Sequence, residues 1–196
     1  KAACRSMSGD ASVINSEFGE AAVTSKSGDA KAFGCRGGVL NVESMSGDAK
    51  AEELSVQNIK VSSKGGDADI VGIKAEKVLV TTISGDISAD KLESDILKTS
   101  VVSGDMSIRG TSREMTLTNG SRDIIVVQHG DTAAKVSTRS GDVHFHLKNG
   151  GNGFAARVST HGDIQYRYQD LKLNDAANGI HRYGAAGSML DIQMTS

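Results

Sequence analysis

The sequence of 196 residues contains no proline, no tryptophan and only 4% aromatic residues, against 23 glycines. An ordinary globular domain uses proline in its turns and aromatic rings in its core, so something other than a bulky core must organise this chain. The longest apolar runs, such as 124–127, fall far short of the roughly 20 residues that a membrane-spanning helix needs. The sequence therefore predicts no transmembrane segment, and no stretch of it reads as a signal peptide.

Charge balance and cysteine content exclude further classes. Lys and Arg number 22 and Asp and Glu 24, so the net charge of −2 gives no electrostatic reason to expect a nucleic-acid partner. The two cysteines, Cys4 and Cys35, are too few for a disulfide framework or a four-ligand zinc site. We expect both to be small buried apolar residues, with a Cys4–Cys35 disulfide as the alternative.

A repeat dominates the sequence. Gly-Asp recurs every 19 residues through six units, and the register then continues after steps of 18, 19 and 21 residues. Ser precedes the pair in most units, so the repeated motif is Ser-Gly-Asp. We call its glycine and aspartate positions the corner file: Gly9, Asp10, Gly28, Asp29, Gly47, Asp48, Gly66, Asp67, Gly85, Asp86, Gly104, Asp105, Asp123, Gly141, Asp142, Gly162 and Asp163.

Each unit carries two stretches of alternating polarity. Counted from the corner glycine, the third and fifth residues are apolar and the fourth is mostly polar, which is the pattern of a short, half-buried strand. Apolar residues at positions thirteen and fifteen predict a second strand, and an often apolar eighth residue predicts a brief third extended segment. Nothing within the period is long enough for a helix.

Such a unit cannot bury its apolar side alone, but stacked units bury a continuous narrow core. The sequence therefore predicts an all-β fold, a single-stranded parallel β-helix (β-solenoid) of about nine 19-residue coils. We expect a single domain over residues 1–196, with repeat coils over about 1–168 and a less regular closing segment over 169–196. An antiparallel sandwich is the alternative, which the constant spacing disfavours because sandwiches vary their loop lengths.

The corner file brings carboxylates close together. We expect its glycines to supply the positive φ of a tight corner, and its aspartates to accept hydrogen bonds from backbone N–H groups just beyond it. Neighbouring carboxylates about 5 Å apart repel by on the order of 1 to 3 kcal/mol, so a row of calcium ions between coils is the alternative. No metal site is assigned; the side chains that would be tested first as ligands are Asp48, Asp67, Asp86, His144 and His146.

The string Val-x-x-x-Ser-Gly-Asp, followed by an apolar-polar-apolar triplet, resembles a bacterial domain family of unknown function that carries an adhesin label and Ser-Gly-Asp β-solenoid repeats. The matching residues include 42–49, 80–87 and 136–143, and residues 184–196 resemble the closing part of that family. The resemblance implies an architecture rather than an activity. It also implies a place at the bacterial cell envelope or outside the cell, because family members often carry a signal or membrane anchor.

A functional site is expected where the repeat is interrupted, at residues 148–153 and 169–187. The sequence has no Gly-x-Ser-x-Gly, His-Glu-x-x-His or phosphate-loop motif, so we expect neither an enzyme nor a cofactor. It predicts a non-catalytic structural or binding module for an unknown protein or glycan ligand. One alternative is a polysaccharide-active β-helix enzyme, which needs carboxylates roughly 5 to 10 Å apart in a groove. The other is a rod that associates end to end through an uncovered parallel edge.

Overall fold

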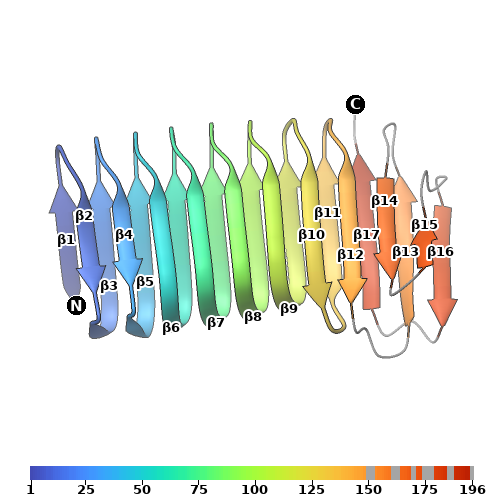
Figure 1. Ribbon diagram of the computed structural model, residues 1–196, viewed down its shortest axis with the longest axis horizontal. Coiled ribbons are helices and arrows are strands. Elements are labelled where there is room, and N and C mark those ends of the chain that lie inside the picture. Colours follow the sequence, from blue (N-terminus) through green and yellow to red (C-terminus); the bar gives the residue numbers. More distant parts are fainter. Residues whose placement is uncertain (149–152, 160–163, 169–170, 174–178, 185–187, 195–196) are drawn as a thin grey trace.

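The computed structural model describes residues 1–148 in full and, beyond them, the backbone of five strands. The described residues form strands and turns without a helix, stacked as the coils of a rod (Figure 1). The strands are β1 (Ala2–Ser6), β2 (Ala11–Ile14), β3 (Glu17–Ser25), β4 (Ala30–Phe33), β5 (Arg36–Ser44), β6 (Ala49–Ser63), β7 (Ala68–Thr82), β8 (Ile87–Val101), β9 (Met106–Asn119), β10 (Ile124–His129), β11 (Ala133–Thr138), β12 (Val143–Lys148), β13 (Gly153–Ser159), β14 (Ile164–Tyr168), β15 (Leu171–Leu173), β16 (Gly179–Gly184) and β17 (Ser188–Met194). In this part of the chain, no helix is suited to crossing a membrane.

Successive coils pair in parallel, with each residue opposite the one 19 positions later. Ala49 pairs with Ala68, and Ala68 pairs with Ile87. Between β8 and β9 the offset falls from 19 to 18 at a bulge that follows Ala89. The predicted parallel β-solenoid is confirmed, with about eight coils at this spacing.

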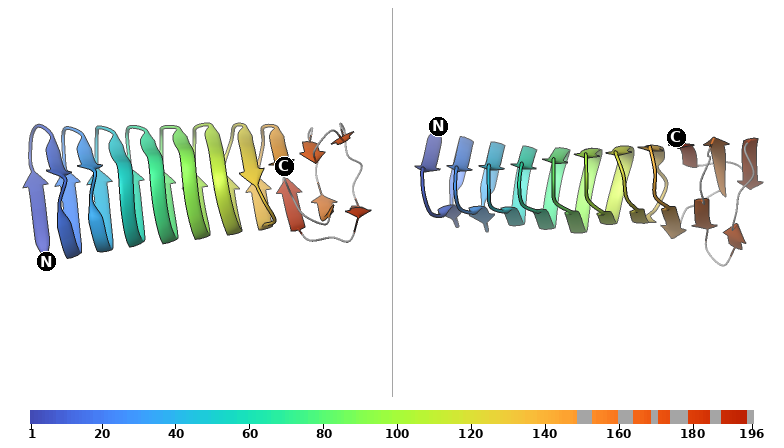
Figure 2. Two further views of the ribbon diagram at one scale, coloured as in Figure 1. Left: turned by 60° about the horizontal axis from the view of Figure 1, so that its bottom comes forward. Right: turned by 90° about the horizontal axis from the view of Figure 1, so that it is seen from above.

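Each coil has two broad faces and one narrow side (Figure 2). The first face holds β2, β4, the beginnings of β6 to β9, then β10, β12 and β14. The second face holds β1, the ends of β3 and β5 to β9, and β11. The narrow side joins them and comprises residues 36–37, 55–57, 74–76, 93–95 and 111–113.

The core is a thin stack of inward-pointing side chains between the two faces. The predicted alternation sets the inward register, so that Val80 is completely buried while Thr81 reaches solvent. Small aliphatic residues fit this interior because two sheets wound from one short coil leave little room between them. Of the two cysteines, Cys35 is buried and Cys4 half-buried; both are free, so the alternative of a Cys4–Cys35 disulfide is wrong.

The ninth coil departs from the prediction. On the first face β14 stacks on β12 in parallel, as the repeat requires. On the second face β17 lies between β11 and β13 and pairs in parallel with both (Figure 1). Two antiparallel strands follow, β15 beside β14 and β16 beside β13. The nine sequence units therefore do not stack in simple chain order, because a later strand enters the second face.

Candidate functional site

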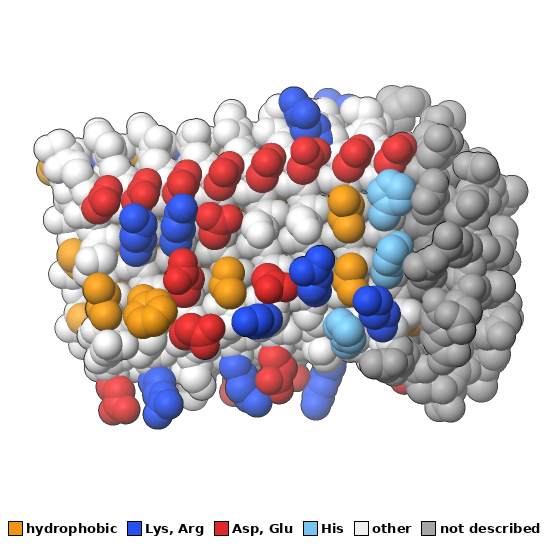
Figure 3. Space-filling model, in the orientation of Figure 1, with side chains coloured by type: hydrophobic (Ala, Val, Ile, Leu, Met, Phe, Trp, Pro, Cys, Tyr) orange, Lys and Arg blue, Asp and Glu red, His pale blue; other side chains and the backbone are white. Residues whose placement is uncertain are grey.

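The aspartates of the corner file form one continuous row along the rod (Figure 3). The backbone N–H of Asp48 donates to Oδ1 of Asp29 at 3.0 Å, and the N–H of Asp67 donates to Oδ1 of Asp48 at 3.0 Å. The same bond recurs from Asp10 to Asp142. One oxygen of each carboxylate thus binds the next coil, and not the backbone N–H groups just beyond its own corner as predicted. Gly162 and Asp163 lie outside the described residues.

The corner glycines are needed for a reason other than the predicted one. Among those described, only Gly9 and Gly141 have positive φ. A Cβ added at Gly47 would lie 2.6 Å from the carbonyl carbon of Gly28, so a side chain would collide with the previous coil. The left-handed residues instead form a second file where the first face turns into the narrow side: Asn15, Gly34, Glu53, Gly72 and Lys91.

Two lysines neutralise the beginning of the aspartate row. Lys31 Nζ lies 3.1 Å from Oδ2 of Asp29, and Lys50 Nζ lies 3.2 Å from Oδ2 of Asp48. The backbone N–H of Asp48, assisted by Lys31, holds the pKa of Asp29 below its ordinary value. The neighbouring Asp69 behaves oppositely, because partial burial raises the pKa of its carboxyl group despite Lys50 at 3.6 Å.

The row loses this neutralisation farther along. Within residues 1–148, no lysine or arginine forms an ion pair with Asp86, Asp105 or Asp123. The fourth position, which carries Lys31 and Lys50 in earlier coils, becomes serine in the coils of Asp86 and Asp105. Ion pairs with lysine therefore neutralise only the early aspartates of the described row.

The predicted metal candidates are spread over separate places. His144 and His146 stand on β12 opposite Ile125 and Val127 of β10, which offer no ligand atoms. Asp48, Asp67 and Asp86 each use Oδ1 for the backbone of the next coil. Within the described residues, no three His, Cys, Asp or Glu side chains are grouped so that they could hold a metal ion.

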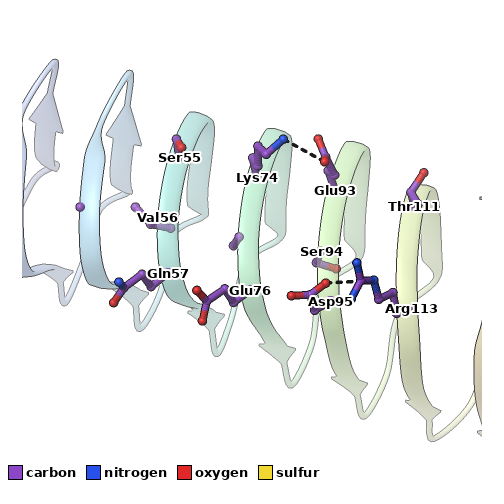
Figure 4. Close-up of a pocket in the computed structure, with 12 residues that line it drawn as sticks. Ser55, Val56, Gln57, Lys74, Glu76, Glu93, Ser94, Asp95, Thr111 and Arg113 are labelled. Carbon is purple, nitrogen blue, oxygen red and sulfur yellow. Dashed lines mark hydrogen bonds and ion pairs between the residues drawn. The ribbon is translucent and has the colours of Figure 1, made fainter.

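A groove of about 520 Å³ runs along the narrow side, across β6 to β9 (Figure 4). Its floor consists of the buried residues Val56, Ala75 and Ser94, which stack in register on successive coils. Exposed side chains at the flanking positions form two walls: Ser55, Lys74, Glu93 and Thr111 on one side, and Gln57, Glu76, Asp95 and Arg113 on the other. Alternation along short strands thus creates a polar channel parallel to the rod.

Ion pairs join neighbouring coils along both walls. Lys74 Nζ lies 2.9 Å from Oε1 of Glu93, and Arg113 Nε lies 3.3 Å from Oδ1 of Asp95. All four side chains are more than half exposed, so each pair contributes only about 0 to 1 kcal/mol to stability. The charges are therefore available to a ligand. Glu76 lies beside Asp95 on the adjacent coil and adds a further negative charge.

A buried polar cluster closes the far end of the groove. Ser94 and Ser112 share a hydrogen bond of 2.7 Å between their hydroxyl groups. Gln128, which is completely buried, accepts the N–H of Ser112 at 3.1 Å and donates to its carbonyl oxygen at 2.9 Å. The side-chain amide thereby continues the hydrogen bonding that a further strand of the narrow side would supply.

This groove was not predicted from the sequence. The predicted sites, 148–153 and 169–187, lie almost entirely outside the residues whose side chains the structure describes. The available signal was the opposite charge of Lys74 and Glu93, which are separated by one period. This signal can be interpreted only once the brief third segment is known to form the narrow side of the coil.

Comparison with known proteins identifies a family but no characterised relative. Two overlapping segments, residues 1–71 and residues 38–196, match the family described as Toastrack DUF4097. Together these segments cover the whole chain. No curated protein and no solved structure matches.

Proposed function

The chain belongs to the Toastrack DUF4097 family, whose function is unknown, and we propose that it is a non-catalytic module that binds an extended protein segment along its narrow side. The observation that carries this proposal is the groove over β6 to β9, with polar walls that repeat at the coil spacing. Adjacent coils are about 4.8 Å apart, so a ligand lying along the rod meets new side chains of both walls at each coil.

The chemistry of the walls favours a polypeptide over a ligand held by stacking. The lining residues include Lys74 and Arg113 as well as three carboxylates, and none is aromatic. Exposed charges of both signs complement a segment that itself carries both signs, and such pairs contribute chiefly to specificity and association rate. An extended peptide also has backbone donors and acceptors for the serine, threonine and glutamine side chains.

The polysaccharide-active enzyme is supported by one observation. Glu76 and Asp95 stand on one wall of the groove on adjacent coils, and the coil spacing of about 4.8 Å places two carboxylates on neighbouring coils, as a glycosidase pair requires. A general acid must, however, be kept protonated, usually by burial in an apolar pocket. Both carboxylates are exposed, and Asp95 is paired with Arg113. The arrangement thus suits binding better than acid catalysis.

We also propose a location at the bacterial cell envelope or outside the cell, with attachment to a partner as the role. The support is the likeness of the Ser-Gly-Asp repeats to domains that carry signals or anchors. A rod of stacked coils suits this role, because it presents its groove on a stiff support. Immunogold labelling of the native protein in its source cells would test the location, and label confined to the cytoplasm would contradict it.

Panning a random peptide library on the immobilised protein tests the binding function. Peptides are selected on the wild type and measured against the double variant Lys74→Glu, Arg113→Glu. We expect at least about tenfold weaker binding, because two positive charges of the walls are reversed. Lys64→Glu, Lys98→Glu, which also reverses two positive charges at exposed positions but outside the groove, is the control and should leave binding unchanged. Binding unaffected by the groove variant would contradict the proposal.

A polysaccharide panel assayed for new reducing ends separates the enzymatic alternative. We expect no cleavage by the wild type. Cleavage that disappears in both Glu76→Gln and Asp95→Asn would overturn the non-catalytic assignment and identify these two carboxylates as the catalytic pair.

A further inference from the structure

The strand β17 occupies a place that the repeat itself does not provide. In the preceding coils, each strand of the second face pairs with the corresponding strand of the next coil, as β9 does with β11. The order then becomes β11, β17, β13, although β13 precedes β17 in the chain. The second face thus contains a slot between β11 and β13, which a strand from the end of the described chain fills.

The sequence of β13 shows that it could stack directly on β11. Residues 133–138 read Ala-Ala-Lys-Val-Ser-Thr, and residues 155–160 read Ala-Ala-Arg-Val-Ser-Thr. The two segments differ only by lysine against arginine, and each precedes a Gly-Asp of the repeat. The solenoid can therefore close this slot by the same parallel pairing that joins its other coils.

The charges of the register partners favour the inserted strand. Lys135 pairs in register with Asp191, and Asp191 pairs in register with Arg157. Direct stacking of β13 on β11 would set Lys135 opposite Arg157, and like charges directly opposite each other destabilise a sheet. The inserted strand places a negative residue between two positive ones. Its Leu190 and Ile192 take the register positions of Ala134 and Val136, so its apolar pattern also fits the repeat.

Only three residues connect β16 to β17. β16 and β17 flank β13 on opposite sides, and only residues 185–187 separate them in sequence. The two strands are roughly 10 Å apart across β13, while four Cα–Cα steps reach at most about 15 Å. Hinges this short favour exchange of the element that follows them between identical chains.

We propose that the slot between β11 and β13 is a strand-acceptor site whose partner is β17 of a second copy of this chain. A foreign β17 makes the same register pairs as the chain's own strand, with Asp191 between Lys135 and Arg157. Only the tether distinguishes the two occupants. The chain's own strand therefore dominates in dilute solution, and exchange between copies increases with protein concentration.

Cysteine cross-linking between two different variants tests the exchange. Ser137 and Gln193 are register partners of β11 and β17, so Ser137→Cys protein is mixed with Gln193→Cys protein, both in a Cys4→Ser background, at increasing concentration under mild oxidation. We expect a cross-linked heterodimer whose yield rises with concentration. A mixture of Ser100→Cys with Gln193→Cys is the control and should give only background, because Ser100 lies on β8 of the same face, away from the slot.

The same cysteines placed in one chain make every outcome decisive. Ser137→Cys, Gln193→Cys in a single chain should form an intramolecular disulfide in dilute solution, and Asp191→Lys should prevent both this bond and the heterodimer. Restoration of both by Lys135→Glu, Arg157→Glu in the Asp191→Lys protein would confirm recognition by charge. An intramolecular bond without any heterodimer would overturn the exchange. A disulfide in a further double variant, Ser137→Cys, Ser159→Cys, would show that β13 stacks directly on β11. That result would overturn the acceptor site itself.

Discussion

The regular coils and the coil from β9 to β11 hold their corners by different chemical groups. In the regular coils a hydroxyl group is sufficient: Ser63 Oγ donates to the carbonyl oxygen of Gly47 at 2.8 Å and accepts the N–H of Gly66 at 2.9 Å. In the later coil Asn119 takes this position. Its Nδ2 donates to the carbonyl oxygens of Gly104 at 3.0 Å and Arg122 at 3.1 Å.

The later coil also follows a step of 18 residues rather than 19. The missing residue is taken up at the bulge after Ala89, and Gln128 then hydrogen-bonds both backbone groups of Ser112. Two side-chain amides thus appear where the period changes. The solenoid therefore tolerates an altered coil length when a longer side chain, with both a donor and an acceptor, satisfies the backbone groups that the coil leaves unpaired.

The largest loss of stability should come from a charge placed in the core of the regular coils. Val80→Asp would bury an unpaired carboxylate between two coils and should lower the free energy of unfolding by about 4 kcal/mol. Thr81→Asp, one residue along on the outward side, should cost less than about 1 kcal/mol. Urea denaturation monitored by circular dichroism measures both. Similar losses in the two variants would mean that the inward register is wrong.

The next largest effect should come from the amide that stabilises the irregular coil. Gln128→Met preserves the approximate volume but leaves the N–H and carbonyl oxygen of Ser112 without this partner, so we expect a loss of about 2 to 4 kcal/mol. Gln57→Met makes the same chemical change on an exposed wall of the groove and should lie within about 0.5 kcal/mol of the wild type. Equal stability of the two variants in thermal melts would contradict the role of Gln128.

A smaller difference should separate the two kinds of corner. Asn119→Ala removes donors to two carbonyl oxygens and should cost about 2 kcal/mol, whereas Ser63→Ala should cost about 1 kcal/mol. Hydrogen exchange at the following corners, residues 120–123 and 64–67, locates the loss. Greater opening at the serine corner than at the asparagine corner would reverse the comparison.

The smallest effect concerns pH. The folded pKa of Asp29 is lowered, so its stabilisation is present above the unfolded value of about 3.9 and is lost as the pH falls through the folded pKa. Asp29→Asn should therefore be less stable than the wild type at pH 7, with a gap that closes in acid.

The neighbouring Asp69 supplies a control of opposite sign, because burial raises its folded pKa and the charged form costs stability at neutral pH. Asp69→Asn should be more stable than the wild type at pH 7, and this gap too should close below about pH 3.9. Melting temperatures between pH 3 and pH 7 give both gaps. Gaps of the same sign would contradict the assigned causes.

Much of the fold follows from the spacing of the Gly-Asp motif in the sequence. Much of the candidate site does not. The Gly-Asp period predicts the parallel register, and the alternation around Val80 predicts which side chains point inward. The role of Gly47 was predicted wrongly, since crowding by the previous coil rather than positive φ excludes a side chain there. Such crowding is invisible in one unit, because it arises only between stacked copies.

The groove and the slot of β17 were missed for the same reason. Lys74 and Glu93 read as unremarkable outward charges until stacking sets them on one wall 2.9 Å apart. Residues 155–160 repeat the pattern of residues 133–138 so closely that direct pairing is the natural prediction. The structure sets β17 between them, where Asp191 separates Lys135 from Arg157.

The amino-acid sequence by itself determined the coil: its length, its strands, its inward face and the single row in which its aspartates lie. These properties recur in every unit, because each unit of the repeat contains the residues that make the interactions concerned. The tertiary structure alone decided where the third segment becomes a groove and which strand follows β11. Both depend on contacts between residues far apart in the chain, where several pairings fit the same pattern and the balance of charge and backbone hydrogen bonding selects one of them.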